Sequence, residues 1–141
     1  MSFFSFGKKK QLDSQSLFND WVAKIIKNES PDSTIIAINF GIFETGPGYK
    51  LYFAGFKSFD KENDDWAVGL GDFKPKDNYF QLPNEEFKEL VFDVAQNKVV
   101  TLIENFMKTQ SYKNSFLERA IAISTGFDDG DLIKIKVSEP G

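Results

Sequence analysis

Two short acidic segments stand out as the places where this chain could do chemistry. The first runs from Asp60 to Asp65 and the second from Asp128 to Asp131, and each carries a net charge of −3. Carboxylates can exchange protons with a substrate, bind divalent cations or attract a basic partner protein. The candidate residues are Asp60, Glu62, Asp64, Asp65, Asp128, Asp129 and Asp131.

The first segment does not have the spacing of an EF-hand calcium loop. Such a loop needs oxygen ligands at positions 1, 3 and 5, glycine at position 6 and glutamate at position 12. Counted from Asp60, position 6 is Asp65 and position 12 is Gly71. The second segment is too short to form a cation cage alone, and a shared site would require the fold to bring both segments together. We expect no metal and no cofactor.

The absence of His and Cys from the sequence excludes most catalytic arrangements. No Ser-His-Asp or Cys-His site, no imidazole or thiolate metal site and no disulfide can form. Gly69-Leu70-Gly71 resembles half of a dinucleotide-binding loop, but Lys74 stands where the third glycine belongs. A phosphate-binding loop needs a Gly-Lys-Ser/Thr triplet, which the sequence lacks. We therefore predict that the protein is not an enzyme.

The charge pattern favours binding to another protein. The whole chain has a net charge of −4, which argues against nucleic acid because phosphate-binding surfaces need clustered Lys and Arg. Acidic patches steer basic partners and speed their association. Trp66, beside the first acidic segment, is a candidate aromatic anchor for such a partner. The alternative interpretation is that both segments are only solvated turns and that Trp66 belongs to the core.

Several short stretches resemble small bacterial immunity-type proteins, which are encoded beside polymorphic or contact-dependent toxins. These stretches are residues 51–56 (LYFAGF), 64–68 (DDWAV), 72–79 (DFKPKDNY) and 126–132 (GFDDGDL). The resemblance implies a protein that neutralises a cognate toxin by stoichiometric binding. An acidic inhibitor fits a basic toxin such as a nuclease, whose cleft is built for phosphates. Two alternatives stay open: a structural or scaffold protein of a phage-like or secretion assembly, and a small-ligand-binding domain.

The clearest predicted element is a helix over residues 13–28. Asp13 can cap its first turn, and apolar residues recur along it at one-and-four spacing. Alternating apolar residues predict a strand over 34–43, and a turn that contains Gly-Pro-Gly joins it to a second strand over 49–56. Both faces of this strand pair are apolar enough to be covered by other parts of the chain.

The middle of the chain is predicted to hold shorter elements and one helical region. Alternation over 66–70 predicts a short strand, and residues 79–82 form another extended piece. Residues 84–108 are predicted to be helical because apolar residues recur there at helical spacing, but the apolar stripe rotates partway along. The region is either one helix kinked near Asn97 or two helices that meet there, with a strand over 99–103 as the alternative.

The end of the chain is predicted to form a helical turn over 116–119 and a hairpin. Strands over 120–127 and 132–137 flank an Asp-Gly pair, which is a strong hairpin signal because Gly accepts a positive φ. Alternation in the last strand places three apolar residues inward and two lysines outward: Ile133, Ile135 and Val137 against Lys134 and Lys136.

Together these elements predict one α+β domain over residues 13–141, preceded by a flexible segment over 1–12. We expect an antiparallel or mixed sheet of about five strands with helices 13–28 and 84–108 packed on it. No membrane span is expected, and lysines follow the first phenylalanines, the reverse of the order in a secretory signal, so we expect a cytoplasmic protein. The expected core residues are Trp21, Ile25, Ile38, Phe40, Phe53, Phe87, Leu90, Val94, Leu102, Ile121 and Ile135.

Overall fold

The computed structural model of the chain describes residues 13–138, and they form four α-helices, a short 3-10 helix and five strands. The predicted α+β class is confirmed. The predicted flexible segment over 1–12 lies outside the described residues. In chain order the elements are α1 (Ser14–Asn28), β1 (Ala37–Thr45), β2 (Gly48–Phe56), the 3-10 helix η2 (Asp64–Ala67), β3 (Tyr79–Gln81), α2 (Asn84–Phe87), α3 (Phe92–Phe106), α4 (Phe116–Arg119), β4 (Ala122–Phe127) and β5 (Ile133–Val137).

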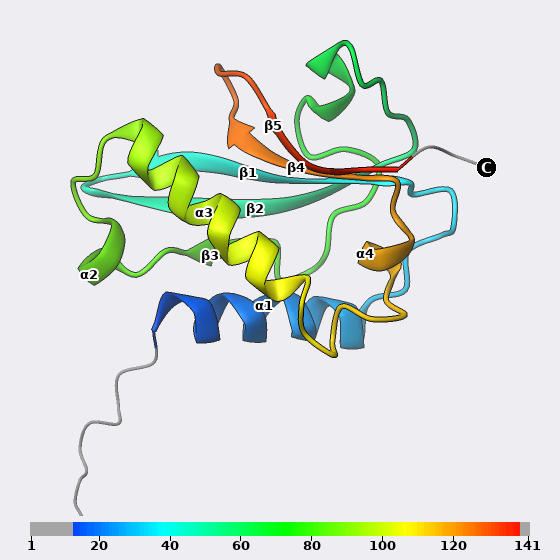
Figure 1. The fold of residues 1–141 in the computed structure, drawn as a ribbon, viewed down its shortest axis with the longest axis horizontal. Helices are drawn as coiled ribbons and strands as arrows, with labels where there is room; N and C mark the ends of the chain where they lie inside the picture. The colour runs from blue at the N-terminus through cyan, green and yellow to red at the C-terminus, as the bar shows by residue number, and fades with distance from the viewer. Residues whose placement is uncertain (1–12, 139–141) are drawn as a thin grey trace, which may run out of the picture.

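The five strands form one mixed sheet in the order β3-β2-β1-β4-β5. The central strand β1 is antiparallel to β2, where Phe40 lies opposite Phe53, and parallel to β4, where Ile38 lies opposite Ile123. A parallel pair needs a long crossover, and the chain between β2 and β4 supplies it. Figure 1 shows the sheet nearly along its edge, with α1 below it and the β2–β3 connection (green, upper right) above it.

Helix α1 forms where the sequence predicts it. The Asp13 carboxylate accepts a hydrogen bond of 2.8 Å from the backbone N–H of Ser16, which caps the first turn. The buried stripe of this helix includes Phe18, Trp21 and Ile25. Trp21 also donates its indole N–H to the backbone carbonyl of Asp77 at 2.9 Å, so the helix is tied to the segment that leads into β3.

Phe18 lies at the centre of the core between the helices and the sheet. Its side chain is fully buried, and edge-to-face or tilted ring contacts of 5.6 to 6.4 Å surround it. Such contacts add roughly 0.5–1.5 kcal/mol per pair beyond area burial, so they account for the high Phe content. The predicted core residues that are buried are Trp21, Ile25, Ile38, Phe40, Phe53, Phe87 and Leu102, while Leu90, Ile121 and Ile135 are partly buried.

The opposite face of the sheet is covered by the β2–β3 connection, as the two apolar faces predict. A second, smaller cluster forms there from Ala37, Tyr52 and Phe56 of the strands together with Trp66 of η2. The Trp66 ring meets the Phe56 ring edge-on at 5.4 Å. This cluster fixes the first acidic segment against the sheet.

Three sequence predictions about the middle of the chain are wrong. Residues 84–108 break at 88–91 and not at Asn97, because Glu89 adopts a left-handed conformation with φ of 62° and donates its N–H to the carbonyl of Pro47. Helix α3 then runs through Asn97 without a break and excludes the alternative strand. Val94, expected in the core, is 44% exposed because the second helix starts anew with its own buried stripe.

The predicted strand over 66–70 is also wrong, because residues 64–67 form the 3-10 helix η2. The side chain of Asn63 accepts a hydrogen bond of 2.9 Å from the N–H of Asp65 and so caps this turn. The alternation of Trp66, Val68 and Leu70 reflects a helical turn followed by a loop.

The predicted alternation of β5 holds only in part because the β4–β5 pairing has a bulge between Ile123 and Ser124. Ile135 packs against the core beneath the sheet, while Lys136 reaches the same side and donates to the carbonyl of Glu118. The predicted inward Val137 is 42% exposed. Among the helices of residues 13–138, none is long and apolar enough to cross a membrane.

The left-handed residue between α2 and α3 gives a test of the corrected boundary. We expect Glu89→Gly to stabilise the protein by about 0.5–1 kcal/mol, because glycine adopts a positive φ without the clash that a Cβ causes. Urea unfolding measures the change. The matched control Lys88→Gly, at a residue with φ of −59°, should destabilise the protein. A loss of stability in Glu89→Gly would contradict the boundary.

Candidate functional site

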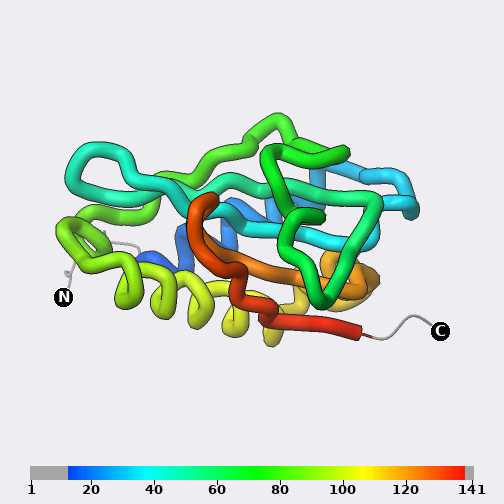
Figure 2. Tube along the Cα trace, turned by 90° about the horizontal axis from the view of Figure 1, so that it is seen from above, coloured from blue at the N-terminus to red at the C-terminus, as the bar shows by residue number. Residues whose placement is uncertain are grey.

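The two acidic segments, far apart in sequence, meet above the face of the sheet opposite α1. Asp64, which opens η2, accepts a hydrogen bond of 3.1 Å through Oδ2 from the backbone N–H of Leu132. Its other oxygen lies 3.5 Å from Nζ of Lys134 in β5. In Figure 1 the β2–β3 connection and the loop of the β4–β5 hairpin both rise above the sheet, and Figure 2 shows them from above. One carboxylate therefore joins the β2–β3 connection to the β4–β5 hairpin.

Between the two connections the chain encloses a hollow of about 450 Å³, which we name the acidic hollow. Its floor is formed by the strands β1 and β4, and its walls come from η2 and the hairpin loop. Four of the predicted carboxylate residues line it. The lining residues are Asn39, Asp64, Asp65, Ala67, Val68, Gly69, Gly126, Phe127, Asp128, Gly130, Asp131 and Leu132.

The floor of the acidic hollow is polar although it lies in a buried part of the sheet. Asn39 in β1 is 2% exposed, and its side-chain oxygen accepts a hydrogen bond of 2.8 Å from the Ser124 hydroxyl. Beside it, a Cβ on Gly126 would lie 3.0 Å from the backbone oxygen of Asp131. Glycine at this position lets the hairpin loop approach the strand closely.

Tyr52 holds the second acidic segment in place from below. Its hydroxyl donates a hydrogen bond of 2.6 Å to Oδ1 of Asp128. The ring lies across Gly41 of the neighbouring strand, where a Cβ would come within 2.0 Å of the ring atom Cζ. Burial, followed by the bond to Asp128, raises the pKa of Tyr52 well above its ordinary value of about 10. The phenol is thus a neutral donor that positions the carboxylate.

The remaining predicted site residues do not line the acidic hollow. Asp60, Glu62 and Asp129 are exposed but do not line it, and the carboxylate of Asp60 accepts the N–H of Glu62 within its own turn. Trp66 is only 9% exposed and packs between the rings of Phe56 and Phe59. The structure therefore supports the interpretation that Trp66 belongs to the core, where it fixes η2 from below.

Sequence reasoning missed Asn39, Tyr52, Gly41 and Gly126 as parts of the site. Asn39 carried a signal, because it is a polar residue in the middle of an otherwise apolar strand. No sequence signal indicated a role for Tyr52, because it belongs to the aromatic stretch 49–56, which is typical of a buried strand. Its role depends on which residue lies opposite and above it, which only the sheet register and the hairpin loop determine.

The acidic hollow is not arranged as a cation site. Across residues 13–138, no group of three or more His, Cys, Asp or Glu side chains is placed to hold a metal ion. One of the lining carboxylates, Asp64, already faces an ammonium group and a backbone N–H.

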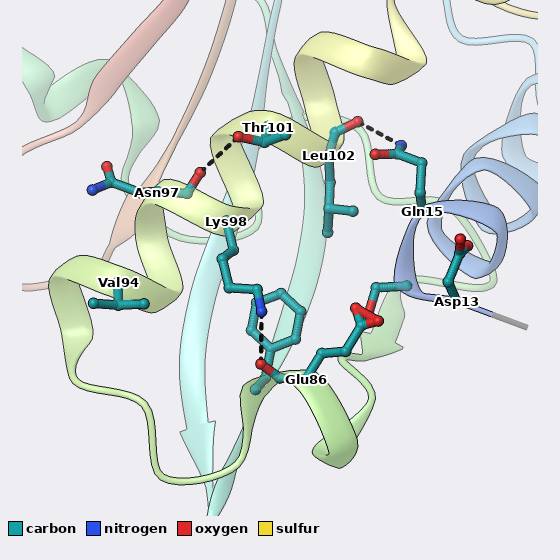
Figure 3. Close-up of a pocket in the computed structure, with 10 residues that line it drawn as sticks. Asp13, Gln15, Glu86, Val94, Asn97, Lys98, Thr101 and Leu102 are labelled. Atoms are coloured by element: carbon teal, nitrogen blue, oxygen red, sulfur yellow. Dashed lines mark hydrogen bonds between the residues drawn. The ribbon is translucent and has the colours of Figure 1, made fainter.

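A second groove of about 460 Å³ lies between α1, α2 and α3 (Figure 3). Lys98 spans it, since its Nζ donates to the carbonyl of Glu86 at 2.9 Å and lies 5.1 Å from the centre of the Phe87 ring. Gln15 of α1 donates to the carbonyl of Leu102 at 3.0 Å. These contacts hold the three helices together. The hydroxyl of Ser14, which also lines the groove, is buried and has no hydrogen-bond partner among residues 13–138.

Comparisons of the chain with protein-family models, with curated proteins and with solved structures find no match.

The contact between Tyr52 and Asp128 predicts a specific pH dependence of stability. Because the pKa of Tyr52 is raised on folding, its contribution is fully present below the ordinary tyrosine pKa of about 10 and is lost as the pH rises above it. We expect Tyr52→Phe to lower stability by about 1 kcal/mol at pH 7 and to lose less stability than wild type between pH 9 and pH 11.

Urea unfolding at several pH values measures this difference. Tyr79→Phe, at a half-exposed tyrosine in β3, is the matched control and should leave stability at pH 7 unchanged. Equal pH dependence in wild type and Tyr52→Phe would show that the hydroxyl does not form this contact.

Proposed function

We propose that this protein is a binding module that recognises a basic partner protein through the acidic hollow and its rim. The observation that carries the proposal is the meeting of the two acidic segments. Their combined net charge is −6 on a chain of net charge −4, and one cation, Lys134, lies beside them. A concave acidic surface focuses the electrostatic field and raises the rate at which a basic partner arrives.

The lining of the acidic hollow fits a Lys or Arg side chain of such a partner. The walls supply the carboxylates of Asp65, Asp128 and Asp131, and the floor supplies the amide of Asn39. An arginine presents five N–H donors in a fixed geometry, which suits a site with several acceptor oxygens. The partner is therefore a protein with an exposed basic side chain surrounded by further positive charge.

The partner class that we propose is a bacterial toxin, with this protein as its immunity-type inhibitor in the cytoplasm. Two of the stretches that resemble immunity-type proteins, residues 64–68 and 126–132, form walls of the acidic hollow. A basic nuclease is the toxin type that this surface fits best, because its cleft is built to attract phosphates. The inhibitor then acts by stoichiometric binding at or beside that cleft and needs no catalytic residue.

Co-expression with the open reading frame adjacent to this chain's gene tests the assignment. We expect the neighbour to be toxic alone, and the pair to grow normally and to co-purify. A neighbour whose toxicity persists in the presence of this protein, and which does not co-purify with it, would contradict the immunity assignment.

A pair of charge reversals tests the surface itself. Glu62→Lys with Asp129→Lys changes one exposed residue in each acidic segment, and we expect association with the partner to slow by about tenfold or more at low salt. Its dependence on salt should also flatten, because fewer charges steer the encounter.

The matched control is Asp20→Lys with Glu104→Lys, at exposed residues of α1 and α3. It changes the total charge by the same amount at positions outside the acidic hollow. Surface plasmon resonance at several salt concentrations compares the two variants. Equal rates for both pairs would place the binding surface elsewhere.

A further inference from the structure

The groove between α1, α2 and α3, which we name the helix groove, has the size and the lining of a small-molecule site (Figure 3). Its volume of about 460 Å³ lies within the range of roughly 300–1,000 Å³ that is typical of ligand pockets. Phe87 and Leu102 supply buried apolar walls, and the partly exposed Val94 extends them toward the surface. Ligand pockets combine such walls with a small number of polar groups that fix the orientation of the ligand.

The hydroxyl of Ser14 is the polar group of the helix groove that the fold itself does not use. Ser14 is only 3% exposed, and its Oγ has no hydrogen-bond partner among residues 13–138. Capping of α1 does not need this hydroxyl, because the Asp13 carboxylate already accepts the N–H of Ser16. A buried hydroxyl without a partner costs stability, which an alanine at this position would avoid. The hydroxyl is therefore available to bind a ligand.

Glu86 supplies a second polar group to the helix groove. Its half-buried carboxylate forms no hydrogen bond or ion pair with another residue of the described part of the chain. Figure 3 shows this side chain extending from α2 toward α1. Gln15 and Thr101, which also line the groove, are in contrast already bonded to backbone carbonyls of α3. A ligand thus meets one hydroxyl, which donates or accepts, and one carboxylate, which accepts.

The charges around the helix groove disfavour both cations and anions as ligands. Lys98 holds its ammonium group 5.1 Å from the centre of the Phe87 ring, where it repels a cation placed on that wall. The carboxylates of Asp13 and Glu86 outnumber this ammonium group and repel an anion. A hydroxyl is the uncharged group that can accept a hydrogen bond from Ser14 and donate one to Glu86.

We propose that the helix groove binds a small uncharged alcohol or phenol. The apolar body of this ligand packs against Phe87, Val94 and Leu102. Its hydroxyl bonds to Ser14 and Glu86. The site is separate from the proposed binding of a basic partner, because the helix groove lies on the helix side of the sheet and the acidic hollow lies on the opposite face.

Nuclear magnetic resonance titrations of the full chain with benzyl alcohol and with toluene test the site. The two probes share a ring, and only benzyl alcohol carries a hydroxyl. We expect benzyl alcohol to bind with a dissociation constant on the order of 1 mM, as is typical of so small a ligand. It should shift the amides of Ser14, Phe87 and Leu102 and leave those of Gly126 and Asp131, at the acidic hollow, unchanged.

The variant Ser14→Ala separates the hydrogen bond from the apolar contact. We expect it to weaken the binding of benzyl alcohol by about fivefold, the effect of one hydrogen bond, and not to weaken the binding of toluene. The matched control Ser16→Ala changes an exposed serine of the same helix that does not line the helix groove, and it should leave both affinities unchanged. Both variants keep α1 intact, because alanine favours a helix more than serine does.

Two charged analogues of the same size test the choice of an uncharged ligand. Benzoate and benzylammonium should each bind to the wild-type chain at least about threefold more weakly than benzyl alcohol. The variant Glu86→Gln keeps the shape of the side chain and removes one of the two carboxylates. It should therefore raise the affinity for benzoate.

Three results would overturn the proposed ligand site. The first is no binding of benzyl alcohol, which would mean that water alone satisfies the Ser14 hydroxyl. The second is an affinity for benzyl alcohol that Ser14→Ala leaves unchanged, and the third is tighter binding of either charged analogue. None of these results bears on the acidic hollow, whose binding of a basic partner is measured separately.

Discussion

The candidate site depends on one carboxylate, that of Asp64, which joins two connections more than sixty residues apart in sequence. Its Oδ2 accepts the N–H of Leu132 and its Oδ1 faces the ammonium group of Lys134. A hydrogen bond from an uncharged backbone N–H to a charged carboxylate contributes about 1–2 kcal/mol to stability. That is enough to determine how two loops are placed relative to each other. Leu132 also packs against the cluster that contains Trp66, so an apolar contact supports the same junction.

The sheet forms the floor beneath the two connections where they meet. Strand β1 is paired on both sides and buried on both faces, which gives a rigid floor. Gly41 makes room for Tyr52 to reach Asp128, and Gly126 lets the hairpin loop lie close to β4. The aromatic core beneath the sheet supplies stability, so the upper face can hold a concentration of negative charge that contributes little to folding.

The sequence predicted the class of fold, α1 and the strands of both hairpins, because capping and hydrophobic periodicity are local. It did not predict the break at Glu89, the helical turn at Asp64 or the bulge that turns Lys136 inward, since each depends on partners distant in sequence. For the candidate site, the distribution of charged residues identified the two acidic segments. It did not show that the fold brings them into contact. Trp66, the expected aromatic anchor, is buried because burial depends on tertiary packing and not on the residue type.

Hydrogen exchange at the backbone N–H of Leu132 tests most directly whether the two acidic segments form one surface. The bond to Asp64 predicts that this amide exchanges about tenfold more slowly in the wild-type chain than in Asp64→Ala, while the amides of β1 keep their protection in both. Exchange of Leu132 at the rate of an unprotected loop in the wild type, or a rate unaffected by the substitution, would contradict the account.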